Sequence, residues 1–311
     1  MLSAIDLHSG KTVALDRPAV LCLGNFDGVH KGHAKLLSET KRLSRELSDK
    51  YPDIIGGAWC FLQPPADFLF DCPPPHLTEN DEKMRLFAKA GLDVVIFGDF
   101  NEYKNMSPET FVSEVLIKQC RAVKTVCGFN FRFGKNASGK PSDLTGFECG
   151  DALVVPEVTE GGKIVSSTNI RAAILSGDIE MANRMLGRPF SLELDVKRGK
   201  HIGSKLGFPT INQNFGKNSP ILSPGVYATK IEIDGETFPS ITNVGQNPTF
   251  GDDSPIHCET HIIGVDKEFH PEKARVYFFT KLRGEKKFPS PEELQNAVFS
   301  DIKTVKKYFN I

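Results

Sequence analysis

Short apolar runs alternate with amphipathic segments along the first part of the chain. The apolar runs predict strands over residues 19–23, 55–62, 93–97, 123–127 and 152–155, and the amphipathic segments predict helices over residues 32–47, 79–90 and 108–118. Strands that alternate with helices pair in parallel, with helices on both faces of the sheet. Ligands of such α/β sheets bind at the carboxyl ends of the strands, so we expect a functional site there.

From about residue 191 the pattern changes to short β-type runs separated by Gly, Pro, Asn and Asp. These runs, at residues 192–196, 226–233, 241–244, 257–265 and 274–282, are typical of an antiparallel barrel or sandwich. A terminal helix is predicted over residues 291–309, with Ser290 as its N-cap. A helix that ends at Gly187 joins the two halves, and we predict domains over residues 1–186 and 187–311.

The composition is that of an ordinary globular protein, with 40% hydrophobic and 25% charged residues over a length that allows two domains. A formal net charge of −1 argues against nucleic acid as a partner, because a phosphate backbone favours a basic surface. The seven cysteines form no CxxC pair, which argues against a disulfide framework and a cysteine metal site. We find no signal-like N-terminus and no apolar window of membrane-spanning length, and therefore expect a cytoplasmic protein with no membrane partner.

The segment Gly24–His33, with the sequence GNFDGVHKGH, follows the first strand and leads into a helix. Its glycines allow a tight turn and the close approach of a ligand to the backbone. The helix N-terminus favours a phosphate, and His30 and His33 offer two imidazole donors to it. Such a site suits the attack of a phosphate on the α-phosphorus of ATP, which needs positioning and charge stabilisation but no enzyme nucleophile. Capping or packing by the histidines is the alternative, and a Rossmann dinucleotide site is disfavoured because the glycine spacing is not GxGxxG.

Two later segments suit the same site. The sequence SSTNIR at residues 166–171 opens a helix with hydroxyl groups and an arginine, which complement a triphosphate. The sequence GFNFRFG at residues 128–134 follows a strand and contains three phenylalanines beside Asn130. Taken alone, the first segment is a well-capped helix, and three phenylalanines are more often core than ligand wall, although at the end of a strand they can flank a flat ring.

In this order and spacing the three segments resemble the N-terminal module of the bacterial bifunctional riboflavin kinase/FAD synthetases, which belong to the HxGH nucleotidyltransferases. The resemblance implies a Rossmann-like fold and catalytic roles for His30 and His33 in adenylyl transfer. It also implies a flavin contact at Asn130 and an ATP site formed by Gly24, Phe26, Asp27, Gly28, His30, His33, Ser167, Thr168 and Arg171. One departure is the sequence FLQPP at residues 61–65, where the family usually has a phenylalanine followed after one residue by Pro-His-Pro, so the imidazole of that loop is missing.

A second constellation lies in the sequence GSKLGFPTIN at residues 203–212. Thr210 and Asn212 are two apart on an extended segment, so their side chains share one face. A hydroxyl and an amide oxygen side by side suit a hard cation such as Mg²⁺, which brings the phosphates of a nucleotide with it. Glu259 and His261 repeat this spacing on another strand, where a carboxylate suits proton removal from an alcohol. For each pair alone, the polar face of a half-solvated strand is the simpler explanation.

This half of the chain resembles the riboflavin kinase module. The resemblance is carried by GxxxGFPTxN, by GVY at residues 225–227, NxGxxPTF at 243–250, ExH at 259–261 and LRxExxF at 282–288. It implies Mg²⁺ at Thr210 and Asn212, and Glu259 as the general base on the ribityl 5′-hydroxyl. It also implies a flavin contact at Arg283 and ATP contacts from Gly203, Lys205, Gly207, Thr210 and Asn212.

Three functions are compatible with these patterns. The first is a bifunctional enzyme that phosphorylates riboflavin to FMN and adenylylates FMN to FAD, so that its partners are the small molecules riboflavin, FMN, FAD and ATP. The second is an FAD synthetase whose barrel only binds flavin or regulates; Thr210, Asn212 and Glu259 argue against a silent barrel. The third is an adenylyltransferase for a nicotinate or pantetheine phosphate, which leaves the barrel motifs unexplained. The formation of homo-oligomers stays open.

Overall fold

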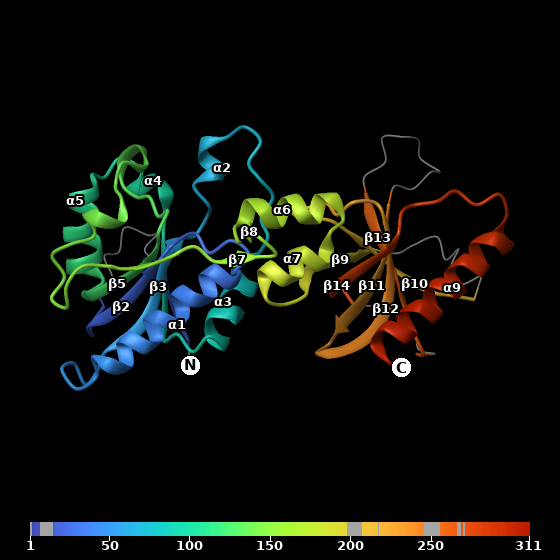
Figure 1. The fold of residues 1–311 in the computed structure, drawn as a ribbon, viewed down its shortest axis with the longest axis horizontal. Helices are drawn as coiled ribbons and strands as arrows, with labels where there is room; N and C mark the ends of the chain where they lie inside the picture. The colour runs from blue at the N-terminus through green and yellow to red at the C-terminus, as the bar shows by residue number, and fades with distance from the viewer. Residues whose placement is uncertain are drawn as a thin grey trace. The chain divides into compact units, whose positions relative to one another are not determined.

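A computed structural model describes residues 2–6, 15–197, 207–216, 218–245, 256–265, 269 and 271–311. It divides into two compact units, Met1–Ser167 and Thr168–Ile311. The first unit contains a parallel sheet and the second a closed antiparallel barrel with a terminal helix, as Figure 1 shows. The expected fold class is therefore confirmed.

Six parallel strands form the sheet of the first unit, in the order β1-β4-β3-β2-β5-β6. Their bounds are Ser3–Asp6 for β1, Ala19–Leu23 for β2, Ile55–Phe61 for β3, Val94–Gly98 for β4, Ala122–Gly128 for β5 and Leu153–Val155 for β6. All except β1 coincide with predicted strands. The strand order reverses between β2 and β5, and such a switch point opens a ligand crevice at the carboxyl ends of the two strands.

Helices cover both faces of this sheet. Helices α1 (Lys31–Glu46) and α3 (Asn80–Lys89) pack on one face, where Leu37 and Phe87 join the core. The other face packs against the π-helical segment η1 (Phe111–Gln119), so the predicted helix over residues 108–118 continues in a different hydrogen-bond pattern after its first turn, α5. The short elements of the unit are α2 (Ala66–Leu69), α4 (Phe100–Tyr103), α5 (Pro108–Thr110), η2 (Lys135–Ala137), η3 (Pro141–Asp143) and the hairpin of β7 (Thr159–Glu160) and β8 (Lys163–Ile164).

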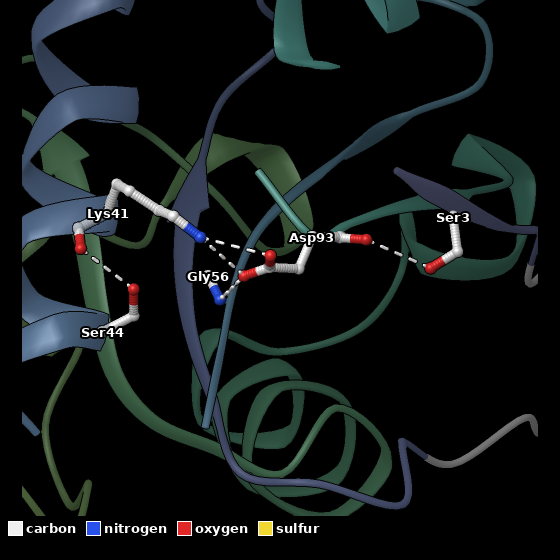
Figure 2. A network of polar contacts seen from close by, with 5 residues as sticks. All are labelled: Ser3, Lys41, Ser44, Gly56 and Asp93. Atoms are coloured by element: carbon white, nitrogen blue, oxygen red, sulfur yellow. Dashed lines mark hydrogen bonds and ion pairs between the residues drawn. The ribbon is translucent and has the colours of Figure 1, made fainter. Parts of the chain in front are cut away.

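Polar contacts among Ser3, Lys41, Gly56 and Asp93 form a clamp that joins helix α1 to the amino ends of the strands (Figure 2). The Asp93 carboxylate accepts a hydrogen bond from the Gly56 amide at 2.9 Å and forms an ion pair with Lys41 at 3.1 Å. The Asp93 carbonyl accepts a hydrogen bond from the hydroxyl of Ser3 in β1. Because these contacts lie at the end of the strands opposite to the switch-point crevice, the clamp concerns stability.

The second unit is a barrel of six strands closed in the order β10-β13-β12-β11-β14-β9. Their bounds are Phe190–Lys197 for β9, Thr210–Asn214 for β10, Gly225–Ile233 for β11, Glu236–Gly245 for β12, His257–Ile262 for β13 and Lys273–Arg283 for β14. The terminal helix α9 (Pro291–Phe309) begins after Ser290, whose side chain caps it, as predicted. Val305 of α9 is fully buried and belongs to the cluster that covers the outer face of β11 and β12.

Helices α6 (Ser167–Ser176) and α7 (Ile179–Leu186) lie between the sheet and the barrel in the sequence. Helix α7 ends at Gly187 in the left-handed conformation, as predicted. The side-chain amide of Asn183 donates to the Phe278 carbonyl at 2.9 Å and accepts from the Phe190 amide at 2.6 Å. These bonds tie α7 to β14 and β9, so α7 belongs to the barrel unit. The two units therefore divide before α7, whereas the predicted domain boundary lies after residue 186. That boundary stays a prediction about which fragments fold independently.

A chain of hydrogen-bonded polar side chains crosses the interior of the barrel. Thr229 bonds to both Ser240 and Thr242 at 2.8 Å, Thr242 bonds to Thr260 at 3.0 Å, and Thr260 donates to the side-chain oxygen of Gln213 at 2.8 Å. All five side chains are fully buried. Buried polar groups of this kind are costly unless paired, so the chain favours one register among the four strands that contribute to it.

Candidate active sites

The loop after β2 has an unusual backbone. Phe26, Gly28 and Val29 have φ angles of 52°, 84° and 38°. Glycine tolerates such an angle, but a β-branched valine adopts it only when its surroundings impose it. The Phe26 ring is fully buried against Phe87, with ring centroids 5.1 Å apart, so this loop is anchored in the core and presents its backbone at the switch point.

The two histidines of this loop lie face to face at the start of α1. Their rings stack with centroids 3.7 Å apart and an angle of 14° between the planes. His30 is the N-cap of α1, and its Nδ1 accepts a hydrogen bond from the His33 amide at 3.3 Å. The first turn of α1 contains no acidic side chain, so the positive end of its dipole is left for an anion.

Gly32 is required by the position of the His30 ring. A Cβ atom at Gly32 would lie 3.1 Å from both Cε1 and Nδ1 of His30, which is closer than ordinary van der Waals contact. The glycine between the histidines therefore lets the first imidazole fold back over the helix N-terminus. This is a steric reason for the spacing HxGH.

Asp27 braces the loop from below. Its Oδ1 accepts hydrogen bonds from the amides of Leu77 at 2.8 Å and Thr78 at 3.2 Å, and the Thr78 hydroxyl accepts from the Gly28 amide at 2.5 Å. Asp27 and Thr78 are both buried. These bonds connect the loop to residues fifty positions away, and they hold its strained backbone in place.

The beginning of α6 also contacts the loop. The hydroxyl of Ser167 donates to the carbonyl of Asp27 at 2.8 Å. The helix begins at Ser167, as expected, and continues through Thr168 and Arg171. Lys31, between the two histidines, forms an ion pair with Glu160 at 2.6 Å.

The carboxyl end of β5 lies at the other side of the switch point. Phe129 and Asn130 follow this strand and are exposed, whereas Phe133 is buried in the core beside Phe111. The three phenylalanines of this segment thus divide between core and surface. Asn130 is exposed just past the carboxyl end of β5, the strand that pairs with β2.

The predicted kinase residues meet on the outer face of the barrel. Strand β10 pairs with β13 so that Thr210 faces His261 and Asn212 faces Glu259. On the other side of β13, Asn243 faces Glu259. Side chains of directly opposed residues lie about 5 Å apart at Cβ, so a hydroxyl, two amides and a carboxylate gather over three strands.

Two histidines flank Glu259 on the same strand. The Nε2 of His257 lies 3.3 Å from the Glu259 carboxylate, and the Nδ1 of His261 donates to the Pro209 carbonyl at 2.9 Å. Burial lowers the pKa of His261, and the bond to Pro209 acts in the opposite direction. The Glu259 side chain keeps 38% of its surface exposed, so it is open to a ligand.

Four other residues were assigned to the kinase site from the sequence, and the structure describes two of them. Gly207 has a φ of 85°, a conformation that favours glycine. Gly203 and Lys205 lie outside the described residues. Two nitrogens of the Arg283 guanidinium, Nε and one terminal nitrogen, contact the same carboxylate oxygen of Asp301 on α9, at 2.9 and 2.8 Å.

Comparison with known proteins covers both units. An FAD synthetase family model matches residues 12–169, and a riboflavin kinase family model matches residues 186–309. A bifunctional riboflavin kinase/FMN adenylyltransferase of Buchnera aphidicola (from Schizaphis graminum) is 34% identical over 94% of this chain and 95% of its own. The enzymes of that name from Bacillus subtilis and Escherichia coli K12 are each 31% identical over 94% of this chain and 93% of theirs.

The chain belongs to the bifunctional riboflavin kinase/FMN adenylyltransferase family. The expected class, a transferase with an FAD synthetase domain and a riboflavin kinase domain, is thereby confirmed. The third function considered above, an adenylyltransferase for another phosphate, loses its support because the riboflavin kinase model matches the barrel.

One solved structure from Streptococcus pneumoniae has the same fold over the full length. It has a TM-score of 0.87, is 27% identical and covers 97% of this chain and 98% of its own, and it is described as a macrolide-efflux protein. That description concerns the Streptococcus pneumoniae protein, whereas both family models that match this chain are of flavin-related enzymes. Within the described residues, we find no helix with the length and apolarity needed to cross a membrane.

Sequence patterns miss several residues that build these sites. Thr78 braces the loop after β2, and nothing in the sequence connects it with Asp27, because the bond joins distant segments. Lys83 of α3 is 2% exposed although it stands in a charged run typical of a solvated helix. His257 has the same period-two spacing as Glu259 and His261, and that signal was available.

Proposed function

We propose that the two units catalyse successive steps from riboflavin to FAD. In the barrel, the ribityl 5′-hydroxyl takes the γ-phosphoryl group of ATP and gives FMN and ADP. At the switch point of the sheet, a phosphate oxygen of FMN attacks the α-phosphorus of a second ATP and releases pyrophosphate. The observation that carries the proposal is that each unit has its own polar constellation, the stacked histidines at the start of α1 and the Asn212–Glu259 pair across β10 and β13.

In the sheet unit, the loop after β2 positions the nucleotide. The amides at the start of α1 and the imidazoles of His30 and His33 hold the phosphate oxygens on which charge grows as the bond to pyrophosphate breaks. Ser167 begins the helix that carries Thr168 and Arg171, and we assign these three to the ATP site together with the loop. Asn130, exposed after β5, is assigned to the flavin side.

The ATP assignments within the loop differ in kind. The side chain of Phe26 is fully buried and that of Asp27 is bound to backbone amides, so these residues contribute through the shape of the loop. Gly28 is likewise buried and its amide is bonded to Thr78, so it contributes through the same shape, and the half-buried Gly24 is assigned to the ATP site with them. Because no side chain has to be deprotonated as a nucleophile, positioning and charge stabilisation supply the acceleration.

In the barrel unit, Glu259 accepts the proton of the 5′-hydroxyl as its oxygen attacks the γ-phosphorus. Its carboxylate is exposed and lies beside His257, which orients it. Arg283 is assigned to the flavin end, held in place by Asp301. Gly207, and with it Gly203 and Lys205, are assigned to the phosphates of the second ATP.

The oxygen donors on the outer face of the barrel fit a magnesium ion. Thr210 and Asn212 stand on the same side of β10, and Glu259 faces Asn212. Hydroxyl, amide and carboxylate oxygens are the donors that Mg²⁺ accepts, with water and nucleotide phosphates as the remaining ligands. When bound, the ion neutralises charge on the transferring phosphoryl group, while Thr210 and Asn212 fix its place relative to Glu259.

Product analysis tests the proposal directly. The full chain is incubated with Mg²⁺, ATP and either riboflavin or FMN, and the products are separated by chromatography. We expect FMN and FAD from riboflavin, and FAD from FMN. FAD from FMN without any FMN from riboflavin would leave only the adenylyltransferase, and the absence of both products would refute the proposal.

Two sets of variants assign the reactions to the units. His30→Ala or His33→Ala is expected to abolish FAD formation and spare FMN formation. Glu259→Gln is expected to slow FMN formation by roughly 10²–10⁴-fold and to spare FAD formation from added FMN. Because unfolding of one unit alone would also remove only one activity, urea unfolding of each variant is compared with that of the parent chain to exclude a loss of structure.

The remaining assignments follow from this chemistry. ATP and free flavins are cytoplasmic metabolites, and we propose that the enzyme acts in the cytoplasm on these small molecules alone. Cell fractionation of the source organism, with antibody detection of the chain, tests the location. Enrichment in a secreted or membrane fraction would contradict it.

A further inference from the structure

A lysine ammonium of α3 is buried near the carboxyl end of β3 with few partners. Lys83 is only 2% exposed, and its Nζ donates to the side-chain oxygen of Asn80 at 3.3 Å. Among the described residues it forms no ion pair with a carboxylate. The adjacent Glu82 binds Arg85 through both oxygens, at 2.8 and 2.9 Å, so its charge is directed elsewhere. A buried ammonium with one neutral partner is expensive, and it calls for an anion nearby.

The position of Lys83 in its helix adds to this cost. It is the fourth residue of α3, close to the positive end of the helix dipole, where a cation is disfavoured. The N-cap residue, Glu79, makes no side-chain hydrogen bond to the helix. Helix propensity and packing would both be served by an apolar residue at this position, so neither explains the lysine.

Residues on both sides of Lys83 contact the loop that carries the histidines or the strand beside it. Its partner Asn80 donates to the Leu62 carbonyl just past the end of β3, and Thr78, two residues earlier, bonds to the Gly28 amide. One turn further along α3, Phe87 packs edge-on against Phe26. Burial raises the pKa of the Cys60 thiol in β3 to about 11, and the Lys83 charge acts in the opposite direction, as expected for a cation close to the carboxyl half of that strand.

We propose that Lys83 is the buried counter-charge for the phosphates that bind at the loop between Gly24 and His33. It is a positioning residue, because its buried ammonium acts on the loop from the neighbouring segment, through a medium of low dielectric in which charges are weakly screened. This inference rests on the proposed adenylyltransferase function of the same loop. The free protein bears the cost of the buried charge, and the bound polyphosphate offsets it.

The proposal predicts that stability and binding change in opposite directions. Lys83→Met keeps the length and apolar stem of the side chain and removes the charge. We expect the melting temperature of the unliganded variant to equal or exceed that of the parent chain. We expect the dissociation constant of inorganic pyrophosphate, measured by titration calorimetry with the full chain, to rise roughly tenfold or more. The KM for ATP in FAD formation from FMN should rise by a similar factor.

Controls separate this role from others. Lys89→Met, at an exposed position in the last turn of the same helix, should leave pyrophosphate binding and FAD formation unchanged. Lys83→Gln removes the same charge with a polar side chain, and it takes the place of Lys83→Met should the latter fail to fold. Formation of FMN from riboflavin should stay unchanged in all three variants.

The outcomes are distinguishable. A neutral Lys83 variant that binds pyrophosphate with the affinity of the parent chain would overturn the inference while the proposed function stands. A parent chain that neither binds pyrophosphate nor makes FAD would refute the proposed function itself. Strong destabilisation of both neutral variants would show that Lys83 serves the fold, and would also overturn the inference.

Discussion

Replacement of Gly32 by alanine separates catalysis from stability in the sheet unit. The added Cβ would lie 3.1 Å from Cε1 and Nδ1 of the His30 ring, so the ring has to retreat by a few tenths of an ångström. Its Nδ1 then moves away from the His33 amide, to which it is bonded at 3.3 Å. The change is confined to the place where we expect the phosphates to bind.

Two opposing effects determine the stability of this variant. Loss of an N-cap bond costs about 0.5–2 kcal/mol, and the gain in helix propensity from glycine to alanine offsets up to about 1 kcal/mol. The free energy of unfolding should therefore change by no more than about 1 kcal/mol. Activity responds to geometry instead, since misplacing a catalytic group by about 1 Å can cost roughly 10²-fold. For a smaller shift we expect FAD formation to fall roughly 10- to 100-fold.

The assay compares initial rates of FAD formation from FMN and ATP with urea unfolding of the same preparations. Gly56→Ala is a matched control, because its Cβ would make a similarly short contact, 3.2 Å to the Ser44 hydroxyl. Gly56 lies near the amino end of β3, away from the histidines. The control should form FAD at the rate of the parent chain. Both variants should form FMN from riboflavin at the rate of the parent chain. A Gly32→Ala chain with unchanged stability and an undiminished rate of FAD formation would refute the requirement for this position of the imidazole.

Further predictions concern stability. Asp93→Ala should lower the free energy of unfolding by about 1–2 kcal/mol through loss of the bond to the Gly56 amide and a half-exposed ion pair, and Asp93→Asn should lower it less; equal losses would contradict the bond's importance. Thr242→Val should cost about 1–2 kcal/mol in urea unfolding, because two buried hydroxyls lose one partner each. His261 has a lowered pKa in the folded chain and about 6.5 in the unfolded chain, so protons bind preferentially to the unfolded chain. The contribution of neutral His261 to the free energy of unfolding should be complete above about pH 6.5 and decline below it. In His261→Gln, the free energy of unfolding should therefore fall less between pH 7 and 5.5 than in the parent chain.

Hydrophobic periodicity predicts most of the elements because their burial is regular. Strands such as β2, with every residue buried, and helices with one apolar face leave a clear pattern. Strand β1 was missed because it is a four-residue edge strand with mixed polarity. Strand β10 was expected only as an extended segment, since its sequence, TINQN, is polar and its one fully buried residue is Gln213.

The sites were predictable to the extent that their residues are close in the sequence. His30 and His33 are near neighbours, and the glycine between them indicates how they meet. The brace from Asp27 to Thr78 and the buried charge of Lys83 depend on packing between segments about fifty residues apart, for which a single sequence contains no signal. For the loop after β2, the sequence therefore predicts the chemical groups, and only the structure shows the residues that hold the loop in place.

Strand register determines which polar side chains of the barrel lie on its outer face. Interior contacts that fix the register therefore also fix the positions of these outer side chains. Side chains alternate along β10, so a shift of one residue would turn Asn212 inward and Gln213 outward. Gln213 is held inside by Thr260, which lies next to Glu259 on the facing strand. The buried polar chain thus fixes which residues meet across β10 and β13. It follows that Thr242→Val should reduce riboflavin phosphorylation more than its loss of stability explains, although Thr242 faces away from the proposed site, whereas FAD formation from FMN should be unaffected.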